Sequence, residues 1–240
     1  MMKKRPSLLL LAGLFSTLAL TPACGSDSTG PSGSTLEWHD VPSPAGNVRV
    51  AVVPPADSTT GPHPVILALP WGLGSEDLVL SFISRYWSNL PRQRGYYLVS
   101  PAVRGTTLED TAGDIIPAIF DWMNQELDYD PDKVALVGAS NGGRGMFHAA
   151  LAEPDRFATF LGMPGSYAGD PEALSVLVGK QVWLVVGEFD TNWIQLGEAT
   201  IDALEGQGVR TRFDIAGNQG HVITINVNLL LDALDEEIGN

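Results

Sequence analysis

One run of residues organises this chain: Val134-Ala-Leu-Val-Gly-Ala-Ser-Asn-Gly-Gly143. Residues 134–137 are apolar and rich in β-branched side chains, which predicts a buried strand that stops at Gly138. Residues 144–153 favour a helix. We therefore expect a strand, a tight turn and a helix, with Ser140 inside the turn.

The turn has the spacing Gly138-x-Ser140-x-Gly142. A serine on so sharp a strand-to-helix turn has a strained backbone, and the residues two before and two after it must be small. Its hydroxyl is exposed at the carboxyl edge of the sheet, where the helix N-terminus faces any developing negative charge. Ser140 is therefore a candidate nucleophile; the alternative is a glycine-rich turn with an incidental serine.

The N-terminus predicts export. Residues 1–23 combine the basic head Lys3-Lys-Arg5, an apolar run over 8–20 and the small residue Ala23, as in a signal peptide. The run is shorter than the roughly 20 residues of a membrane-spanning helix. Thr21-Pro-Ala-Cys24 resembles the lipidation motif of bacterial lipoproteins, although Thr21 and Pro22 depart from it. We expect a lipid anchor at Cys24 on a bacterial envelope membrane, the alternative being a secreted or periplasmic protein with an unpaired cysteine.

Composition restricts the rest of the chain. With a single cysteine there is no internal disulfide framework. Residues 24–35 are polar and predict a flexible tether, and 36–240 suffice for one domain. Removing the signal takes away three basic residues and no acidic ones, so the net charge changes from −14 to −17. Such a domain repels nucleic acid and anionic membranes, which leaves the lipid anchor as the membrane contact.

Strands and helices alternate along 36–240, which predicts an α/β fold with a mostly parallel sheet covered by helices on both faces. The first two strands should pair antiparallel. Pro91 is expected to end the first helix, and Pro117 to lie in the first turn of the second. The expected strands are 36–41, 47–53, 65–69, 96–100, 134–137, 157–161, 181–186 and 209–215; the expected helices are 75–90, 114–127, 144–153, a short one after Asp170, 193–205 and one containing 227–234.

A serine nucleophile needs a base, and the base needs an acid to fix its tautomer. His221 follows the last strand in a glycine-containing loop and is the expected base. The other histidines are less suitable: His39 and His63 fall in or beside N-terminal surface segments, and His148 lies within the nucleophile helix.

Asp190 directly follows the strand 181–186 and is the expected acid; it could instead cap the next helix. Two other carboxylates compete with it. Asp170 is better explained as a helix cap, and Glu188 stands too close to the strand end to turn inward.

The order Ser140, Asp190, His221 and the glycine-flanked turn resemble the α/β-hydrolase superfamily over nearly the whole domain. Within it, Asp128-Tyr-Asp-Pro-Asp132 and the turn resemble compact esterases of the dienelactone hydrolase, polyhydroxybutyrate depolymerase and feruloyl esterase type. The resemblance implies a serine hydrolase that cleaves carboxylic esters through an acyl-enzyme, with no organic cofactor. No cluster with metal-ligand spacing is present in the sequence.

The resemblance also points to the loop Leu69-Pro-Trp-Gly-Leu-Gly74. Family members often carry His-Gly there, followed by a residue whose N–H helps to form the oxyanion hole. In this chain Trp71 replaces the histidine. The expected donors are the N–H groups of Asn141 and Leu73, or of Trp71 if the loop turns one residue earlier.

The intervals between the three catalytic candidates leave no room for a large lid domain, so we expect an open site for small or polymer-end esters. Four side chains could line an apolar pocket or simply pack: Trp71, Met163, Tyr167 and Trp193. A serine peptidase, an acyltransferase and an inactive surface-anchored binding protein are the alternatives. Acyl and alcohol specificity and the oligomeric state stay open.

Overall fold

A computed structural model describes residues 36–56, 59–103 and 107–239. The predicted signal peptide, the tether and Cys24 lie outside these ranges. The described residues form one eight-stranded sheet in the order β1-β2-β4-β3-β5-β6-β7-β8. β2 is antiparallel to β1 and β4, and the other neighbouring strands are parallel. The strands are β1 (Glu37–Val41), β2 (Val48–Val53), β3 (His63–Leu69), β4 (Tyr97–Ala102), β5 (Tyr129–Gly138), β6 (Thr159–Gly162), β7 (Gln181–Gly187) and β8 (Arg210–Ala216).

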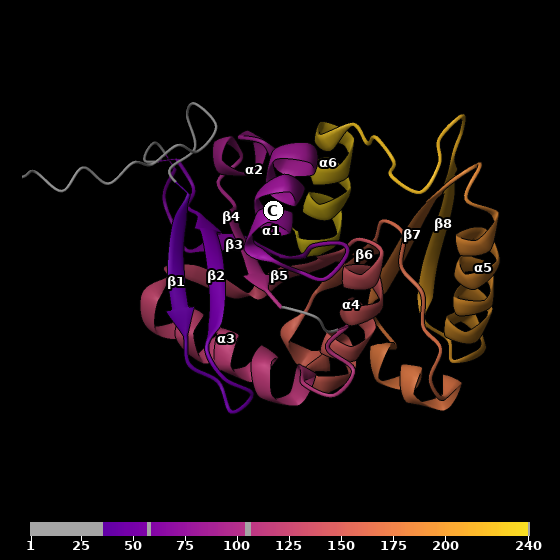
Figure 1. Cartoon of the computed structure of the whole chain (residues 1–240), viewed down its shortest axis with the longest axis horizontal. Coiled ribbons are helices and arrows are strands. Elements are labelled where there is room, and N and C mark those ends of the chain that lie inside the picture. The colour runs from indigo at the N-terminus through magenta and orange to yellow at the C-terminus, as the bar shows by residue number, and fades with distance from the viewer. Residues whose placement is uncertain (1–35, 57–58, 104–106, 240) are drawn as a thin grey trace, which may run out of the picture.

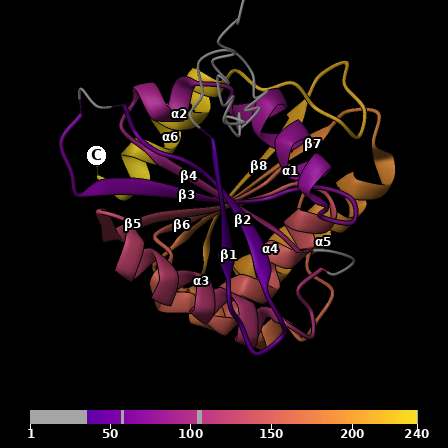
Figure 2. The same ribbon diagram turned by 60° about the vertical axis from the view of Figure 1, so that its left-hand side comes forward.

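Helices cover both faces of the sheet (Figures 1 and 2). One face carries α1 (Glu76–Phe82), its π-helical extension Ile83–Trp87, α2 (Leu90–Gln93) and α6 (Val227–Ile238). The other carries α3 (Ala112–Glu126), α4 (Asn141–Ala152) and α5 (Thr191–Gly206). Short 3-10 turns span Pro154–Arg156 and Pro171–Leu177. Within the described ranges, no helix is both long and apolar enough to cross a bilayer.

The central strands explain why the sheet needs two helical layers. In β5, Val134 and Leu136 pack into the core beneath α3 and α4, whereas Ala135 and Val137 pack into the core beneath α1 and α6. Side chains alternate between the faces of a strand, so a strand that is apolar throughout must be covered on both faces. The predicted mostly parallel sheet with helices on both faces is confirmed, and no large lid domain interrupts the described chain between α4 and α6.

Two predictions about prolines are wrong. The first long helix ends at Trp87, because Ser88 has a left-handed φ of 44°, and Pro91 lies in the first turn of α2 rather than after a helix. Pro117 lies inside α3, beyond its first turn, because that helix begins at Ala112.

His63 and Phe157 also lie in other positions than the sequence predicts. His63 begins β3 and is buried, so it does not belong to a surface segment. Phe157 precedes β6 instead of starting it and packs in the core against Phe120 and Phe160.

Candidate active site

Ser140 lies between the end of β5 and the start of α4 in a strained conformation, with φ 56° and ψ −115°. A non-glycine residue with such angles costs about 1–3 kcal/mol, and neighbouring contacts must hold it in place. The Ser140 N–H donates to the Pro164 carbonyl at 2.9 Å, and the Ala139 N–H donates to the Leu69 carbonyl at 3.1 Å. The loop after β6 and the last residue of β3 therefore fix the turn from both sides.

The glycines of the turn are required by close backbone contacts. A Cβ at Gly138 would lie 2.2 Å from the Gly142 carbonyl oxygen, and one at Gly142 would lie 2.2 Å from the Leu69 oxygen. The predicted need for small residues on both sides of Ser140 is confirmed. Gly143 is equally constrained, since its Cβ would lie 2.1 Å from the Pro164 oxygen, and the sequence analysis missed this contact.

The structure brings Ser140, Asp190 and His221 together. His221 Nε2 lies 2.9 Å from Ser140 Oγ, and His221 Nδ1 lies 2.6 Å from Asp190 Oδ2. The three residues follow β5, β7 and β8, whose carboxyl ends meet at one edge of the parallel sheet. The Asp190 side chain is 13 % exposed and the His221 side chain 43 %, so the carboxylate is sheltered while the imidazole faces solvent. This geometry can pass a proton from the serine oxygen to an imidazole that the carboxylate orients.

The competing groups lie elsewhere. Asp190 occupies the N-cap position of α5 but its side chain makes no capping hydrogen bond, whereas Asp170 accepts from the Glu172 N–H at 3.0 Å and does cap a helical turn. His39 packs on Trp122 with ring centroids 5.0 Å apart. Among the described residues, no three His, Cys, Asp or Glu side chains gather closely enough to hold a metal ion.

The loop that carries His221 is closed by Gln219. The Gln219 side chain accepts from the Thr224 N–H and donates to the Thr224 carbonyl at 3.2 Å, so it bonds across the loop on both sides of the histidine. The sequence does not predict this role. The only signal was a glutamine in a glycine-containing loop, which alone does not indicate a hydrogen-bonded ring.

The loops after β7 and β8 are also bonded to each other. The Phe189 N–H donates to the Gln219 carbonyl at 2.8 Å, and the Asn218 N–H donates to a Glu188 carboxylate oxygen at 2.6 Å. A Cβ at Gly187 would lie 2.0 Å from the Gly220 oxygen, so the two loops pack in direct backbone contact. Glu188, weighed above as a rival acid, instead joins the segment that carries Asp190 to the one that carries His221.

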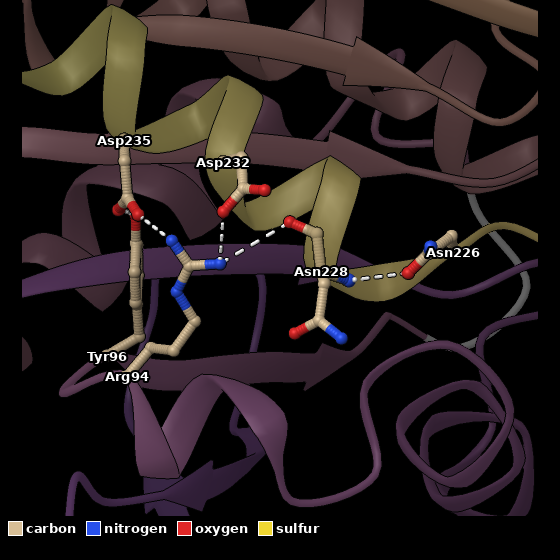
Figure 3. A network of polar contacts seen from close by, with 6 residues as sticks. All are labelled: Arg94, Tyr96, Asn226, Asn228, Asp232 and Asp235. Atoms are coloured by element: carbon tan, nitrogen blue, oxygen red, sulfur yellow. Dashed lines mark hydrogen bonds and ion pairs between the residues drawn. The ribbon is translucent and has the colours of Figure 1, made fainter.

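The helix after the His221 loop is bonded to a segment in the first half of the chain (Figure 3). Arg94 forms ion pairs with Asp232, at 2.6 Å, and with Asp235, and the buried Tyr96 donates its hydroxyl proton to Asp235. Arg94 also donates to the Asn228 carbonyl at 3.4 Å. These contacts hold α6 against the turn that precedes β4, which fixes the far end of the loop carrying His221.

The predicted oxyanion loop is tied to α4 by Asn141, whose side-chain amide donates to the Gly72 carbonyl at 3.1 Å. Gly72 and Gly74 have left-handed φ values of 67° and 60°, which shape the loop. Asn141 is the first residue of α4 and follows Ser140 directly. In the part of the chain that the structure describes, no carbonyl accepts its N–H. The donor roles of Leu73 and Trp71 stay predictions.

Two of the four pocket candidates pack in the core or against it. The Trp71 ring makes edge contacts with Phe82 and Tyr86, at centroid distances of 5.4 and 5.9 Å. Met163 is only 1 % exposed and belongs to the core beneath α1 and α6. Met163 therefore packs in the core, whereas Trp71 packs against it and its place in a substrate pocket stays a prediction.

The other two candidates differ from each other. The Tyr167 ring packs 5.7 Å from Phe147, and its hydroxyl donates to the Asp170 carbonyl at 3.2 Å. Trp193 lies 5.6 Å from the His221 ring. Of the four, Trp193 is the one whose described ring contacts include a residue of the Ser140–Asp190–His221 arrangement.

No protein-family model and no curated protein matches the sequence. Solved structures do match the fold. A thermophilic and thermostable carboxylesterase cloned from a metagenomic library is 16 % identical with a TM-score of 0.61, over 85 % of this chain and 87 % of that one. A thermostable esterase is 17 % identical with a TM-score of 0.63, over 76 % of this chain. The dipeptidyl peptidase 4 of Porphyromonas gingivalis is 16 % identical with a TM-score of 0.65, over 86 % of this chain.

The chain spans 55 % of the thermostable esterase and 36 % of the dipeptidyl peptidase, so the similarity to those two covers only part of each. At these identities the likeness concerns the fold. The strand order, the strained turn at Ser140 and the similarity to these solved structures all indicate the same fold. The chain therefore has the α/β-hydrolase fold that these esterases and this peptidase share.

Proposed function

We propose that this protein is an extracytoplasmic serine hydrolase that cleaves carboxylic esters through an acyl-enzyme on Ser140. One observation carries the proposal: Asp190, His221 and Ser140 form a continuous hydrogen-bonded line, with distances of 2.6 and 2.9 Å. A serine that is merely incidental to a turn does not require a hydrogen-bonded imidazole, nor an imidazole held by a sheltered carboxylate.

In the first half of the reaction, His221 Nε2 takes the proton of Ser140 Oγ as that oxygen attacks the ester carbonyl carbon. The carbonyl oxygen becomes an oxyanion and accepts from the Asn141 N–H and from the N–H of Leu73 or Trp71. Each such donor contributes about 3 kcal/mol to the transition state. The protonated His221 then gives its proton to the departing alcohol, leaving an ester of Ser140 with the acyl group.

In the second half, His221 takes a proton from water as the water oxygen attacks the acyl carbonyl carbon. The Ser140 oxygen leaves with the proton from His221, the carboxylic acid is released and the free serine returns. Asp190 keeps the Nδ1 proton of His221 in place and stabilises its positive form in both halves. No step needs a metal or an organic cofactor.

Esters are proposed over amides for two reasons. An alcohol leaves a tetrahedral intermediate more readily than an amine, so an open site with an exposed base suffices for esters. The similarity also extends over 87 % of the metagenomic carboxylesterase but 36 % of the dipeptidyl peptidase. Peptidase activity and acyl transfer to an added alcohol would use the same three residues and are therefore outcomes of the test.

The test uses the full chain, its Ser140→Ala variant and a fluorophosphonate, which reacts only with an activated serine. Intact mass should show one adduct on the wild type and none on the variant. The wild type should hydrolyse 4-nitrophenyl butanoate but not the matching 4-nitroanilide, and Ser140→Ala should lose about 10⁴-fold or more of this activity. A folded wild type without adduct would contradict the proposal and favour a binding protein.

The extracytoplasmic part of the proposal rests on residues 1–24 of the sequence. In a bacterial host given an alkyne fatty acid, the wild type should become labelled and sediment with membranes, while Cys24→Ser should do neither. An unlabelled wild type in the soluble exported fraction would instead indicate ordinary secretion.

A further inference from the structure

Arg144 lies next to the proposed catalytic residues. It follows Ser140 by four residues on α4, which corresponds to a rise of about 6 Å along the helix. Its guanidinium lies 4.7 Å from the centroid of the Trp193 ring, and that ring lies 5.6 Å from the His221 ring. Arg144 Nη1 also lies 3.5 Å from Asn141 Oδ1. Stacking on the indole of Trp193 therefore holds the permanent positive charge of Arg144 in place near the start of α4.

The charge of Arg144 is not neutralised within the described part of the chain, where no carboxylate forms an ion pair with it. The protein as a whole has 28 acidic and 14 basic residues. Ion pairs within the described ranges do join other arginines to carboxylates: Arg49, Arg94, Arg156, Arg210 and Arg212. Arg144 forms no such ion pair and donates one long hydrogen bond, to Asn141, so most of its five N–H donors stay available for another partner.

Arg144 also lines a cavity of about 160 Å³ between α4 and the loops after β4 and β6. Thr107 and Ser166 bring hydroxyl groups to its wall, and His148 lies on the next turn of α4. Ser166 is only 5 % exposed. The cavity thus offers a cation and two hydroxyl groups, one helical turn from Ser140.

An anionic oxygen group fits these donors best. A guanidinium presents paired N–H groups that match the two oxygens of a carboxylate, and stacking on an aromatic ring fixes its plane. Glu109 lines the same cavity, but it is exposed and water screens its charge. The acidic surface elsewhere is screened beyond about 8 Å at physiological salt, so the charge in direct contact with the ligand dominates.

We propose that Arg144 is a specificity-determining residue that binds a carboxylate on the ester substrate. The preferred substrates are then esters that carry a free carboxylate on either the acyl or the alcohol part. This inference rests on the ester hydrolysis proposed above and adds the chemical class of the substrate. The competing explanation is that Arg144 only braces Trp193 behind His221.

The experiment compares kcat/KM for matched esters after subtraction of the enzyme-free rate. The acyl series is mono(4-nitrophenyl) adipate, neutral 4-nitrophenyl heptanoate and cationic 4-nitrophenyl 6-aminohexanoate. The alcohol series is 3-carboxyphenyl and phenyl butanoate. In at least one series the wild type should prefer the anionic ester. Arg144→Gln should reduce the anionic-to-neutral ratio by about 10–100-fold, and Arg144→Lys should restore part of it.

Arg156→Gln removes the same charge far from the cavity and should leave the ratio at its wild-type value. The ratio is used because a general loss of activity, caused by misplacement of Trp193, cancels from it. An equal ratio in Arg144→Gln and Arg156→Gln, or a preference for the cationic ester, would overturn the inference while ester hydrolysis stands. A wild type that cleaves none of these esters would overturn the proposed function itself.

Discussion

The turn at Ser140 is held by contacts between backbone atoms, and no side chain is available to relax them. Gly142 shows this most clearly, because a Cβ there would lie 2.2 Å from the Leu69 oxygen and 2.5 Å from the Pro70 oxygen. Both carbonyls belong to the end of β3 and the loop that follows, which contains Trp71 and Leu73, the alternative second oxyanion donors. Any movement that makes room for a methyl group must therefore displace that loop.

Gly142→Ala should lower the free energy of unfolding by about 3 kcal/mol, because the clash involves rigid backbone. Gly113→Ala is a matched control: each glycine is the second residue of its helix, but a Cβ at Gly113 meets nothing within 4 Å. The control should be neutral or stabilising by up to about 1 kcal/mol. Urea denaturation measures both, and equal stabilities would show that the turn can open.

The two loops that carry Asp190 and His221 form one hydrogen-bonded unit. Gln219 closes the His221 loop through Thr224 and also accepts the Phe189 N–H from the other loop. These bonds are exposed, so their effect on stability is small, but they set the position of an imidazole that must reach two partners at once.

Gln219→Ala should therefore lower kcat/KM for 4-nitrophenyl butanoate by about 10–100-fold while changing the free energy of unfolding by less than about 1 kcal/mol. Most of the loss should fall on kcat, because the substrate-binding surface is retained. Gln125→Ala removes an exposed glutamine that bonds to the Asp121 carbonyl on α3 and should change neither quantity. Unchanged turnover in Gln219→Ala would mean that the loop holds its shape without this ring.

At the scale of the whole molecule, ion pairs join the C-terminal helix α6 to a segment in the first half of the chain (Figure 3). Arg94 and Asp235 are 141 residues apart in sequence, and their ion pair lies on the face of the sheet that α1 and α6 cover. Arg94→Gln should lower the free energy of unfolding by about 2 kcal/mol, since it removes the Arg94 charge from the partly buried Asp235 carboxylate. Arg49→Gln breaks an exposed pair with Asp40 and should cost less than about 1 kcal/mol. Thermal unfolding at low salt compares them, and equal losses would contradict a special role for Arg94.

The raised pKa values of three tyrosines determine how the stability of the fold should change at alkaline pH. Burial raises the pKa of Tyr86, of Tyr129 and of Tyr167 above the usual 10.0, and the nearby Asp170 carboxylate raises the pKa of Tyr167 further. Above pH 10 the unfolded chain loses these phenolic protons before the folded chain does. The free energy of unfolding therefore falls. Their contribution is complete below about pH 10 and falls as the pH rises toward the folded-state pKa values.

Urea midpoints should therefore decline from pH 9 to pH 11, and phenolate absorbance should lag in the folded protein. Tyr86→Phe should reduce this decline, because phenylalanine has no proton to lose. Identical declines in the wild type and this variant would show that other groups govern the alkaline response.

Local sequence patterns were sufficient for most elements, because an apolar run such as 134–137 and a helical stripe each bury a definite face. These patterns gave wrong predictions where the backbone departs from a regular α-helix but the spacing of apolar residues stays the same. The π-helical turn Ile83–Trp87 keeps its apolar residues inward, and Pro91 is tolerated in the first turn of α2, where a missing N–H has no cost. A proline alone does not distinguish the end of one helix from the start of the next.

The chain order of Ser140, Asp190 and His221 could be found in the sequence because each follows a recognisable strand, and parallel strands bring their carboxyl ends to one edge. The contacts among these residues and around them depend on loops that meet only in three dimensions. The ring made by Gln219, the bond from Asn218 to Glu188 and the stacking of Arg144 on Trp193 join separate segments of the chain. Side-chain contacts between loops leave no periodic trace in a sequence, so only the folded chain shows which groups surround the candidate nucleophile.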